Sequence, residues 1–143
     1  MKKLIAFCAA SIAAVCAIAG GLNTYDGIVY TNLFEPAYIT APAAVTSTAR
    51  NVSALKGNGT VILTASPGSS NIVTYGVSVQ VQDSETGTTA WSNVSSVVAT
   101  GYTNVGTITK IKLDLATVRK YLRVVATSTG DTAVASAVLC GYQ

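Results

Sequence analysis

The chain has 143 residues, of which half are apolar and only 10% are charged, with 3 prolines and no histidine. A charged fraction this far below the roughly 25% of ordinary globular domains excludes a disordered chain, and the lack of a glycine repeat excludes a collagen-like one. Lys2 and Lys3 supply two units of the net charge of +3, so the rest of the chain is nearly neutral. Without a clustered basic surface, nucleic-acid binding is not expected.

The N-terminal segment begins with two lysines and continues in the apolar run Leu4–Ala19. Its end, Ala17-Ile18-Ala19, fits the small-x-small pattern of a signal-peptide cleavage site. The run is short for a helix across a hydrocarbon core of about 30 Å, which takes about 20 residues. Three interpretations stay open for residues 1–19: a cleaved secretory signal, a retained membrane-associated anchor, and an assembly arm that buries its apolar side chains against other subunits.

Residues 20–42 are predicted to form an extended arm or linker. Their short apolar stretches are broken by Asn, Asp, Gly and Pro, and no helical period is visible. Because aromatic side chains are favoured interface anchors, we predict that four aromatic residues of this segment contact a partner. The alternative is that they pack against the domain's own sheet. The four residues are Tyr25, Tyr30, Phe34 and Tyr38.

From residue 43 onward, short extended runs are separated by turn residues every eight to twelve positions. Seven or eight short strands, with no helix long enough to cross between parallel strands, predict an all-β fold. We expect an antiparallel β-sandwich, immunoglobulin-like or jelly-roll-like, over residues 43–143. The predicted strands are 48–55, 60–66, 76–82, 91–94, 97–102, 106–115, 121–128 and 132–140.

Two of these strands alternate between apolar and polar residues. In residues 76–82 valines alternate with Ser and Gln, and in residues 110–115 Ile and Leu alternate with Lys and Asp. A period of two places one set in the core and the other in solvent. The predicted core positions are Val77, Val79, Val81, Ile111, Leu113 and Leu115.

The inventory of catalytic side chains is poor. Without histidine the chain has no Ser-His-Asp triad, no Cys-His pair and no imidazole metal ligand. Cys8, Cys16 and Cys140 show no CxxC spacing and are interpreted as small apolar residues. No glycine-rich phosphate loop occurs either. The sequence therefore predicts a protein that is not an enzyme and that has no catalytic residues, cofactor or metal.

Two polar clusters each allow two interpretations. Asp83 and Glu85 share a turn, which favours a polar hairpin over a weakly bound calcium ion. Arg119, Lys120 and Arg123 lie close together, which favours a solvated strand end over a phosphate site.

The only tryptophan, Trp91, follows the predicted turn 83–89. We predict that it is a core residue, as in most sandwiches. The alternative is an exposed ring that stacks on a sugar, together with Tyr75 and Tyr102.

Two stretches carry a resemblance to known proteins. They are VSVQVQDSETGTTAWSNV, from Val77 to Val94, and KLDLATVRKYLRVV, from Lys112 to Val125, which is followed by a Gly-Asp turn and a final strand of small residues. In this wording the chain resembles small structural proteins of tailed bacteriophages over about residues 45–143. The resemblance implies a capsid-associated or decoration protein with a β-sandwich body. The apolar leader departs from that pattern.

The resemblance implies a non-enzymatic virion structural protein, a capsid decoration or minor capsid component. Such a protein is present in many copies and binds neighbouring capsid subunits. One alternative is a secreted or cell-surface sandwich that binds carbohydrate or protein, and another is a subunit of an extracellular filament. No nucleic-acid partner is expected, and membrane contact is confined to residues 4–19.

Overall fold

The computed structural model describes residues 23–25, 28–69, 71–102 and 105–143, with the backbone alone for 23–25. The apolar segment 1–19 lies outside the described residues. Among the residues described, no helix is long and apolar enough to cross a membrane. The strands are β1 (Asn23–Tyr25), β2 (Ile28–Ile39), β3 (Ala44–Thr46), β4 (Arg50–Asn51), β5 (Lys56–Pro67), β6 (Thr74–Ser84), β7 (Ser92–Tyr102), β8 (Thr107–Asp114), β9 (Tyr121–Ser128) and β10 (Ala133–Tyr142).

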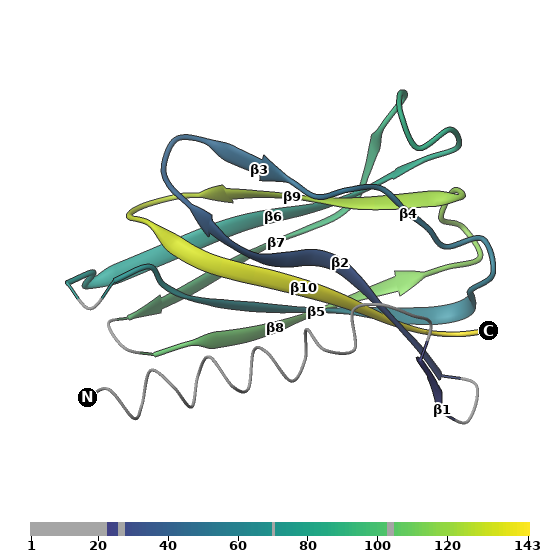
Figure 1. Cartoon of the computed structure of the whole chain (residues 1–143), viewed down its shortest axis with the longest axis horizontal. Coiled ribbons are helices and arrows are strands. Elements are labelled where there is room, and N and C mark those ends of the chain that lie inside the picture. The colour runs from purple at the N-terminus through teal and green to yellow at the C-terminus, as the bar shows by residue number, and fades with distance from the viewer. Residues whose placement is uncertain (1–22, 26–27, 70, 103–104) are drawn as a thin grey trace.

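The strands form two sheets that lie one above the other (Figure 1). One sheet, the β10 sheet, has the order β1-β2-β10-β5-β8. The other, the β6 sheet, has the order β3-β9-β6-β7, with β4 also paired to β9. Every pairing is antiparallel. The predicted antiparallel β-sandwich is therefore confirmed.

The core lies between the sheets, as the alternation in the sequence predicts. Val77, Val79 and Val81 of β6 are fully buried. Ile111 and Leu113 of β8 are buried as well, while the lysines between them are exposed. A period of two turns successive side chains to opposite faces, so one face of each strand packs and the other meets solvent.

The last strand, β10, is a central strand although alanine is a poor strand former. It pairs with β2 on one side and with β5 on the other. Ala133, Ala135 and Ala137 face the core and are buried, and Val134 and Val138 on the opposite face are half-buried. Strand preference depends on context, and two hydrogen-bonded neighbours outweigh the low preference of alanine here.

The sandwich begins earlier in the chain than the predicted boundary at residue 43. β2 pairs with β10 from Ile28 to Ile39, so most of the predicted arm 20–42 belongs to the β10 sheet. The predicted strand 48–55 is reduced to the two-residue strand β4, and Lys56–Gly59, interpreted as a turn, begins β5. The predicted strands 91–94 and 97–102 are one strand, β7.

Four chain reversals gather at one end of the sandwich, on the left in Figure 1. They are residues 40–43, 67–73, 102–106 and 129–132, and we call this end the turn end. Hydrogen bonds between backbone groups tie it together, from Gly68 N to Thr132 O at 2.8 Å and from Thr129 N to Gly76 O at 2.9 Å. Segments far apart in sequence thus form one continuous end of the molecule.

Candidate functional site

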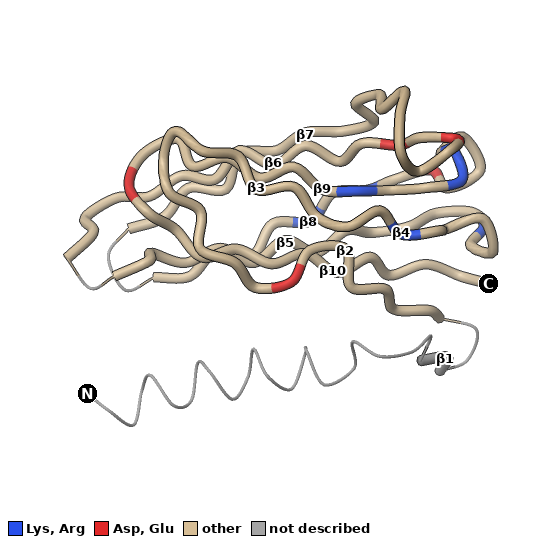
Figure 2. Tube along the Cα trace, turned by 45° about the horizontal axis from the view of Figure 1, so that its top comes forward, with Lys and Arg blue, Asp and Glu red and all other residues tan. Residues whose placement is uncertain are grey.

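The turn end carries almost no charge. Among the residues of its four reversals, only Asp131 is ionisable. Figure 2 shows the lysines and arginines gathered toward the opposite end of the sandwich. A surface with so few charged groups loses little hydration when a partner covers it, so it is suited to contacts made by burial.

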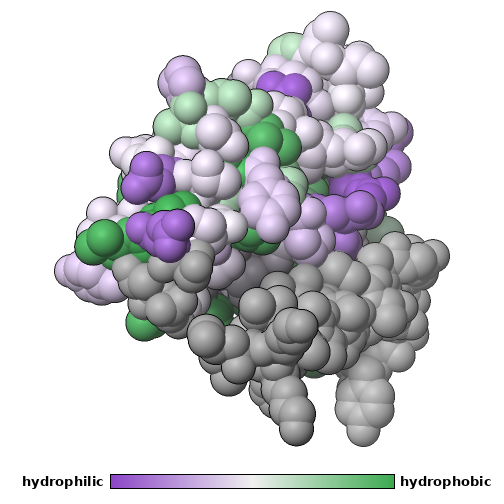
Figure 3. All heavy atoms as spheres, turned by 60° about the vertical axis from the view of Figure 1, so that its left-hand side comes forward, coloured by the Kyte–Doolittle hydropathy of each residue, from purple (hydrophilic) through white to green (hydrophobic). Residues whose placement is uncertain are grey.

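Large apolar side chains are exposed at this end. Val73, Tyr102 and Ile108 are each 71% exposed, and Val105 is 55% exposed. We call these four residues the turn-end surface. Figure 3, which faces this end, shows hydrophobic patches among weakly polar residues. Single exposed apolar residues need no explanation, but a group of them at one end of a domain indicates a contact surface.

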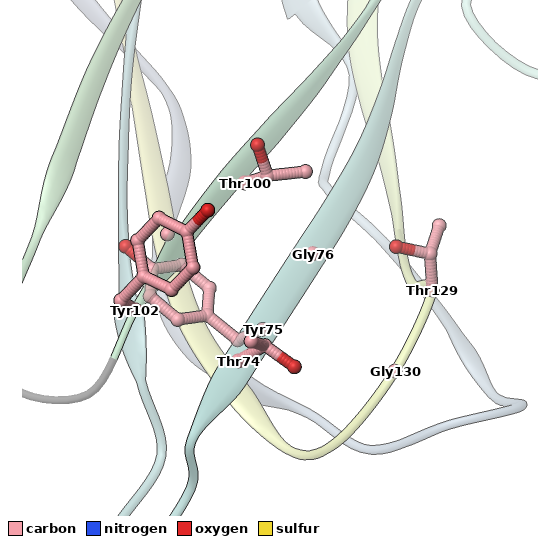
Figure 4. Close-up of a pocket in the computed structure, with 8 residues that line it drawn as sticks. Thr74, Tyr75, Gly76, Thr100, Tyr102, Thr129 and Gly130 are labelled. Carbon is pink, nitrogen blue, oxygen red and sulfur yellow. The ribbon is translucent and has the colours of Figure 1, made fainter.

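A shallow depression of about 270 Å³ lies beside Tyr102, on the outer face of the β6 sheet. Thr100, Gly76 and Thr129 form one row across β7, β6 and the end of β9 (Figure 4). Thr74 pairs with Tyr102 in the next row. The lining therefore offers threonine hydroxyls and one aromatic ring, and it contains no ionisable acid or base that would act in catalysis at neutral pH. The complete lining is Thr74, Tyr75, Gly76, Thr100, Gly101, Tyr102, Thr129 and Gly130.

Two glycines give the depression its shape. A Cβ atom on Gly76 would collide with the hydroxyl of Thr129, so only glycine leaves the floor open beneath that side chain. A Cβ atom on Gly101 would collide with the phenol of Tyr75. Both positions need glycine for close approach of neighbouring groups rather than for an unusual backbone angle.

Tyr75 holds the turn end from below. Its side chain is 3% exposed, and its hydroxyl lies 2.9 Å from the carbonyl oxygen of Ala65 and 2.8 Å from that of Val105. A phenol has a single proton, so it donates to one carbonyl at a time, while Thr107 Oγ1 at 3.3 Å can donate to the phenol oxygen. These contacts fix the 102–106 reversal against β5.

At the opposite end, Asp83 and Arg119 form an ion pair. The carboxyl of Asp83 accepts from Arg119 N at 3.0 Å and from Arg119 Nε at 2.8 Å, and the residue is 6% exposed. Burial alone would raise the pKa of the Asp83 carboxyl, but the hydrogen bonds from Arg119 outweigh burial and lower the pKa below its ordinary value. The pair joins the end of β6 to the connection between β8 and β9.

The other charged residues near Asp83 are also engaged within the chain. The guanidinium of Arg123 lies over the Trp91 ring, 4.2 Å from its centroid, and its Nε donates to Gln82 Oε1 at 2.9 Å. The ammonium of Lys120 lies 5.5 Å from the centroid of the Tyr121 ring. The predicted basic cluster therefore divides into separate intramolecular contacts and does not present a phosphate site.

The calcium alternative for Asp83 and Glu85 finds no support in this geometry. Within the described part of the chain, no group of three or more His, Cys, Asp or Glu residues lies together. The carboxyl of Asp83 is occupied by Arg119, which leaves Glu85 without a second carboxylate ligand. The polar-hairpin interpretation accounts for both residues.

The four predicted contact residues do not form one site. Phe34 is 3% exposed in the core, so its expected role as an exposed contact is wrong, and its packing against the chain's own sheets is the alternative observed. Tyr30 and Tyr38 are 38% and 69% exposed but lie eight positions apart on β2, roughly 25 Å along an extended strand. Tyr38 lies next to the turn end. The side chain of Tyr25 is not described.

Aromatic residues proposed for a sugar-stacking strip are also separated. Tyr102 is exposed, but Tyr75 is a core residue and Trp91 is half-buried under Arg123, so neither an exposed strip nor a fully buried tryptophan is found. Sequence reasoning missed Val73, Val105 and Ile108. A signal existed for Ile108 alone, because it shares the period-two face of Lys110 and Lys112, which are exposed.

Comparison with known proteins adds to the fold alone. No protein-family model matches the chain, and no curated protein matches its sequence. The PBSX exported protein XepA is similar in structure, with a TM-score of 0.51 and 16% identity over 80% of this chain and 37% of that one. A CBM4 structure is also similar, with a TM-score of 0.51 and 12% identity over 87% of this chain and 76% of that one.

Only the fold is shared. The chain spans little more than a third of the length of XepA, and identities this low carry no information about ligands. The CBM4 structure, which the chain covers more fully, shows that an architecture of this kind occurs as most of a separate chain.

Proposed function

We propose that the protein is a non-enzymatic binding module that works in many copies as a virion structural component, a capsid decoration or minor capsid protein. The observation that carries the proposal is the exposed, nearly uncharged turn-end surface, Val73, Tyr102, Val105 and Ile108. The partner is a neighbouring capsid subunit. The resemblance of residues 45–143 to structural proteins of tailed bacteriophages supports this choice of partner.

The physical basis is burial repeated over many copies. Each turn-end surface is small, so one contact is weak. A capsid presents the same acceptor surface many times, and a component present in many copies gains avidity from contacts that are individually weak. Tyr102 supplies the aromatic anchor that commonly dominates such contacts.

Co-sedimentation with particles tests the proposal. The full chain is mixed with capsids purified from its natural source that lack it, and the bound fraction is measured after a density gradient. We expect the wild-type chain to bind in a fixed ratio to the major capsid subunit. Tyr102→Ser is expected to weaken binding about tenfold, the loss of roughly 1.4 kcal/mol that a modest aromatic anchor supplies.

Tyr142→Ser is the matched control. Tyr142 is 55% exposed and lies at the end of β10, away from the turn end, so its loss should leave binding unchanged. Equal losses for both tyrosines, or a wild-type chain that stays at the top of the gradient, would contradict the proposal.

A second candidate function is a secreted or cell-surface module that binds carbohydrate. The specific observation in its favour is the exposed Tyr102 ring beside a depression lined by threonine hydroxyls, because a flat ring and nearby hydroxyls are the groups that bind a sugar. Affinity electrophoresis in gels that contain soluble polysaccharides distinguishes the two candidates. Retardation that Tyr102→Ser abolishes favours the sugar, and retardation by none of the polysaccharides favours the capsid subunit.

A further inference from the structure

The edges of the two sheets are protected very unequally. An unpaired edge strand offers free backbone N–H and C=O groups to any other strand, and proteins block such edges with short strands, charges, prolines or covering groups. The β10 sheet ends in β1 and β8, and the β6 sheet ends in β7 and in the pair β3 and β4. Comparison of these edges identifies one strand without protection along most of its length.

The edge formed by β1 and β2 is blocked. β1 covers only the first part of β2. Beyond it β2 carries Glu35 and Pro36, and proline has no backbone N–H to donate. Arg50 crosses from the other sheet and its Nε donates to the carbonyl oxygen of Asn32 at 3.1 Å. A further strand therefore finds a charge, a missing donor and an occupied acceptor on this side.

Two more edges are also protected. β8 carries the exposed lysines Lys110 and Lys112, the charge that natural edge strands use most often. β3 and β4 have three and two residues and are separated by a break, so neither is long enough to be a template for a new strand.

β7 differs from all three. It has eleven residues without a charged side chain or a proline, and in the described structure it pairs with β6 alone. A bulge opposite Val81 and Gln82 distorts only its start. From Ser95 to Tyr102 the register is regular, and Val98, which faces outward, is 57% exposed.

We propose that β7 pairs in antiparallel orientation with β7 of a second copy of this chain, which joins the two β6 sheets into one continuous sheet. The two-fold axis passes beside Val98, so this residue faces its own copy and the regular part of each strand is paired along its length. A two-fold contact sets identical residues against each other, and a strand without charge is free of the like-charge repulsion that opposes such pairing.

The inference goes beyond the proposed function and does not rest on it. The dimer contact lies along the side of the β6 sheet, whereas the turn-end surface lies at the end of the sandwich. A partner strand from a different protein would also satisfy the backbone, but the uncharged, self-compatible sequence of β7 favours the second copy.

Sedimentation equilibrium of the full chain tests the inference, with Val98→Lys as the variant. The wild-type chain is expected to dimerise, and Val98→Lys to raise the dimer dissociation constant about tenfold or more, because the substitution sets two ammonium groups opposite each other. Ile108→Lys is the matched control: an exposed aliphatic residue on the protected edge strand β8, with no expected effect on the dimer. Thermal unfolding confirms that both variants are folded.

Cysteine cross-linking provides an independent arm that fixes the register. In a full chain with Cys8, Cys16 and Cys140 changed to serine, Val98→Cys is expected to form an intermolecular disulfide on mild oxidation, since residues directly opposite across two strands lie within disulfide reach. Ile108→Cys is expected to remain reduced. A monomeric wild-type chain, a dimer that Val98→Lys leaves intact, or equal cross-linking at both positions would each overturn the inference.

Discussion

The two ends of the sandwich use their side chains differently. At the end that holds Asp83, the polar groups are engaged within the chain: Asp83 with Arg119, and Arg123 with Trp91 and Gln82. At the turn end, Tyr75 and the backbone hold the reversals from beneath, and Val73, Tyr102, Val105 and Ile108 remain exposed.

The comparison shows where a surface is free to bind. Charged residues that look functional in the sequence, such as Arg119 and Arg123, already contribute their hydrogen bonds to the fold. The turn end has few charged or ionisable groups, yet its exposed apolar side chains are the ones available to a partner. Substitutions at the two ends should therefore separate stability from binding.

The largest expected effect is the loss of stability when the ion pair is broken. Arg119→Ala leaves the buried carboxyl of Asp83 without its partner and is expected to lower the free energy of unfolding by about 3 kcal/mol. Urea unfolding measures the change. Arg123→Ala, which removes a ring contact and one hydrogen bond, is expected to cost about 1 kcal/mol. A smaller loss for Arg119→Ala than for Arg123→Ala would contradict the comparison.

The ion pair also predicts a dependence on pH. Because the pKa of Asp83 is lowered in the folded protein, the stabilisation is fully present above the ordinary carboxyl pKa and is lost as the pH falls through the folded value. Urea unfolding from pH 7 to pH 2 is expected to show that the advantage of the wild-type chain over Asp83→Asn shrinks in acid. A constant difference between the two chains across this range would refute the assignment.

Tyr75 tests whether the turn end is held from beneath. Tyr75→Phe leaves the carbonyls of Ala65 and Val105 without the phenol and is expected to cost about 1 kcal/mol of unfolding free energy. Amide hydrogen exchange in residues 102–106 should become faster. Tyr102→Phe removes the same hydroxyl from an exposed ring and is expected to leave stability and exchange unchanged.

The smallest expected effect on stability lies on the turn-end surface itself. Val73→Ser and Tyr102→Ser change exposed side chains and are expected to alter the free energy of unfolding by no more than about 0.5 kcal/mol. Denaturation midpoints measure this. A loss as large as that for Tyr75→Phe would show that these side chains support the fold, and would remove the reason to regard the surface as free for binding.

Much of the fold could be predicted from local patterns. The alternation in β6 and β8 identified Val77 and Ile111 as core residues and Lys110 as exposed, and the residues 83–89 were recognised as a turn. These features depend on backbone geometry that repeats within a few residues, which a sequence displays directly.

The errors occurred where packing from distant segments decides. β2 was interpreted as an arm because its pattern is broken by Glu35 and Pro36, yet pairing with β10 makes it part of the sandwich. Tyr75 was considered as a surface residue, but Gly101 opens the space that its ring fills. Neither partner lies near these residues in the sequence.

The sequence by itself determined the class of fold, the period of the main strands and the scarcity of catalytic groups, because each depends on composition or on neighbouring residues. The tertiary structure decided which strands are central, which edge is unprotected, and that four distant reversals form one apolar end. These features depend on strand pairing between residues as far apart as Ile28 and Tyr142, and backbone hydrogen bonds of that kind are specified by no single segment.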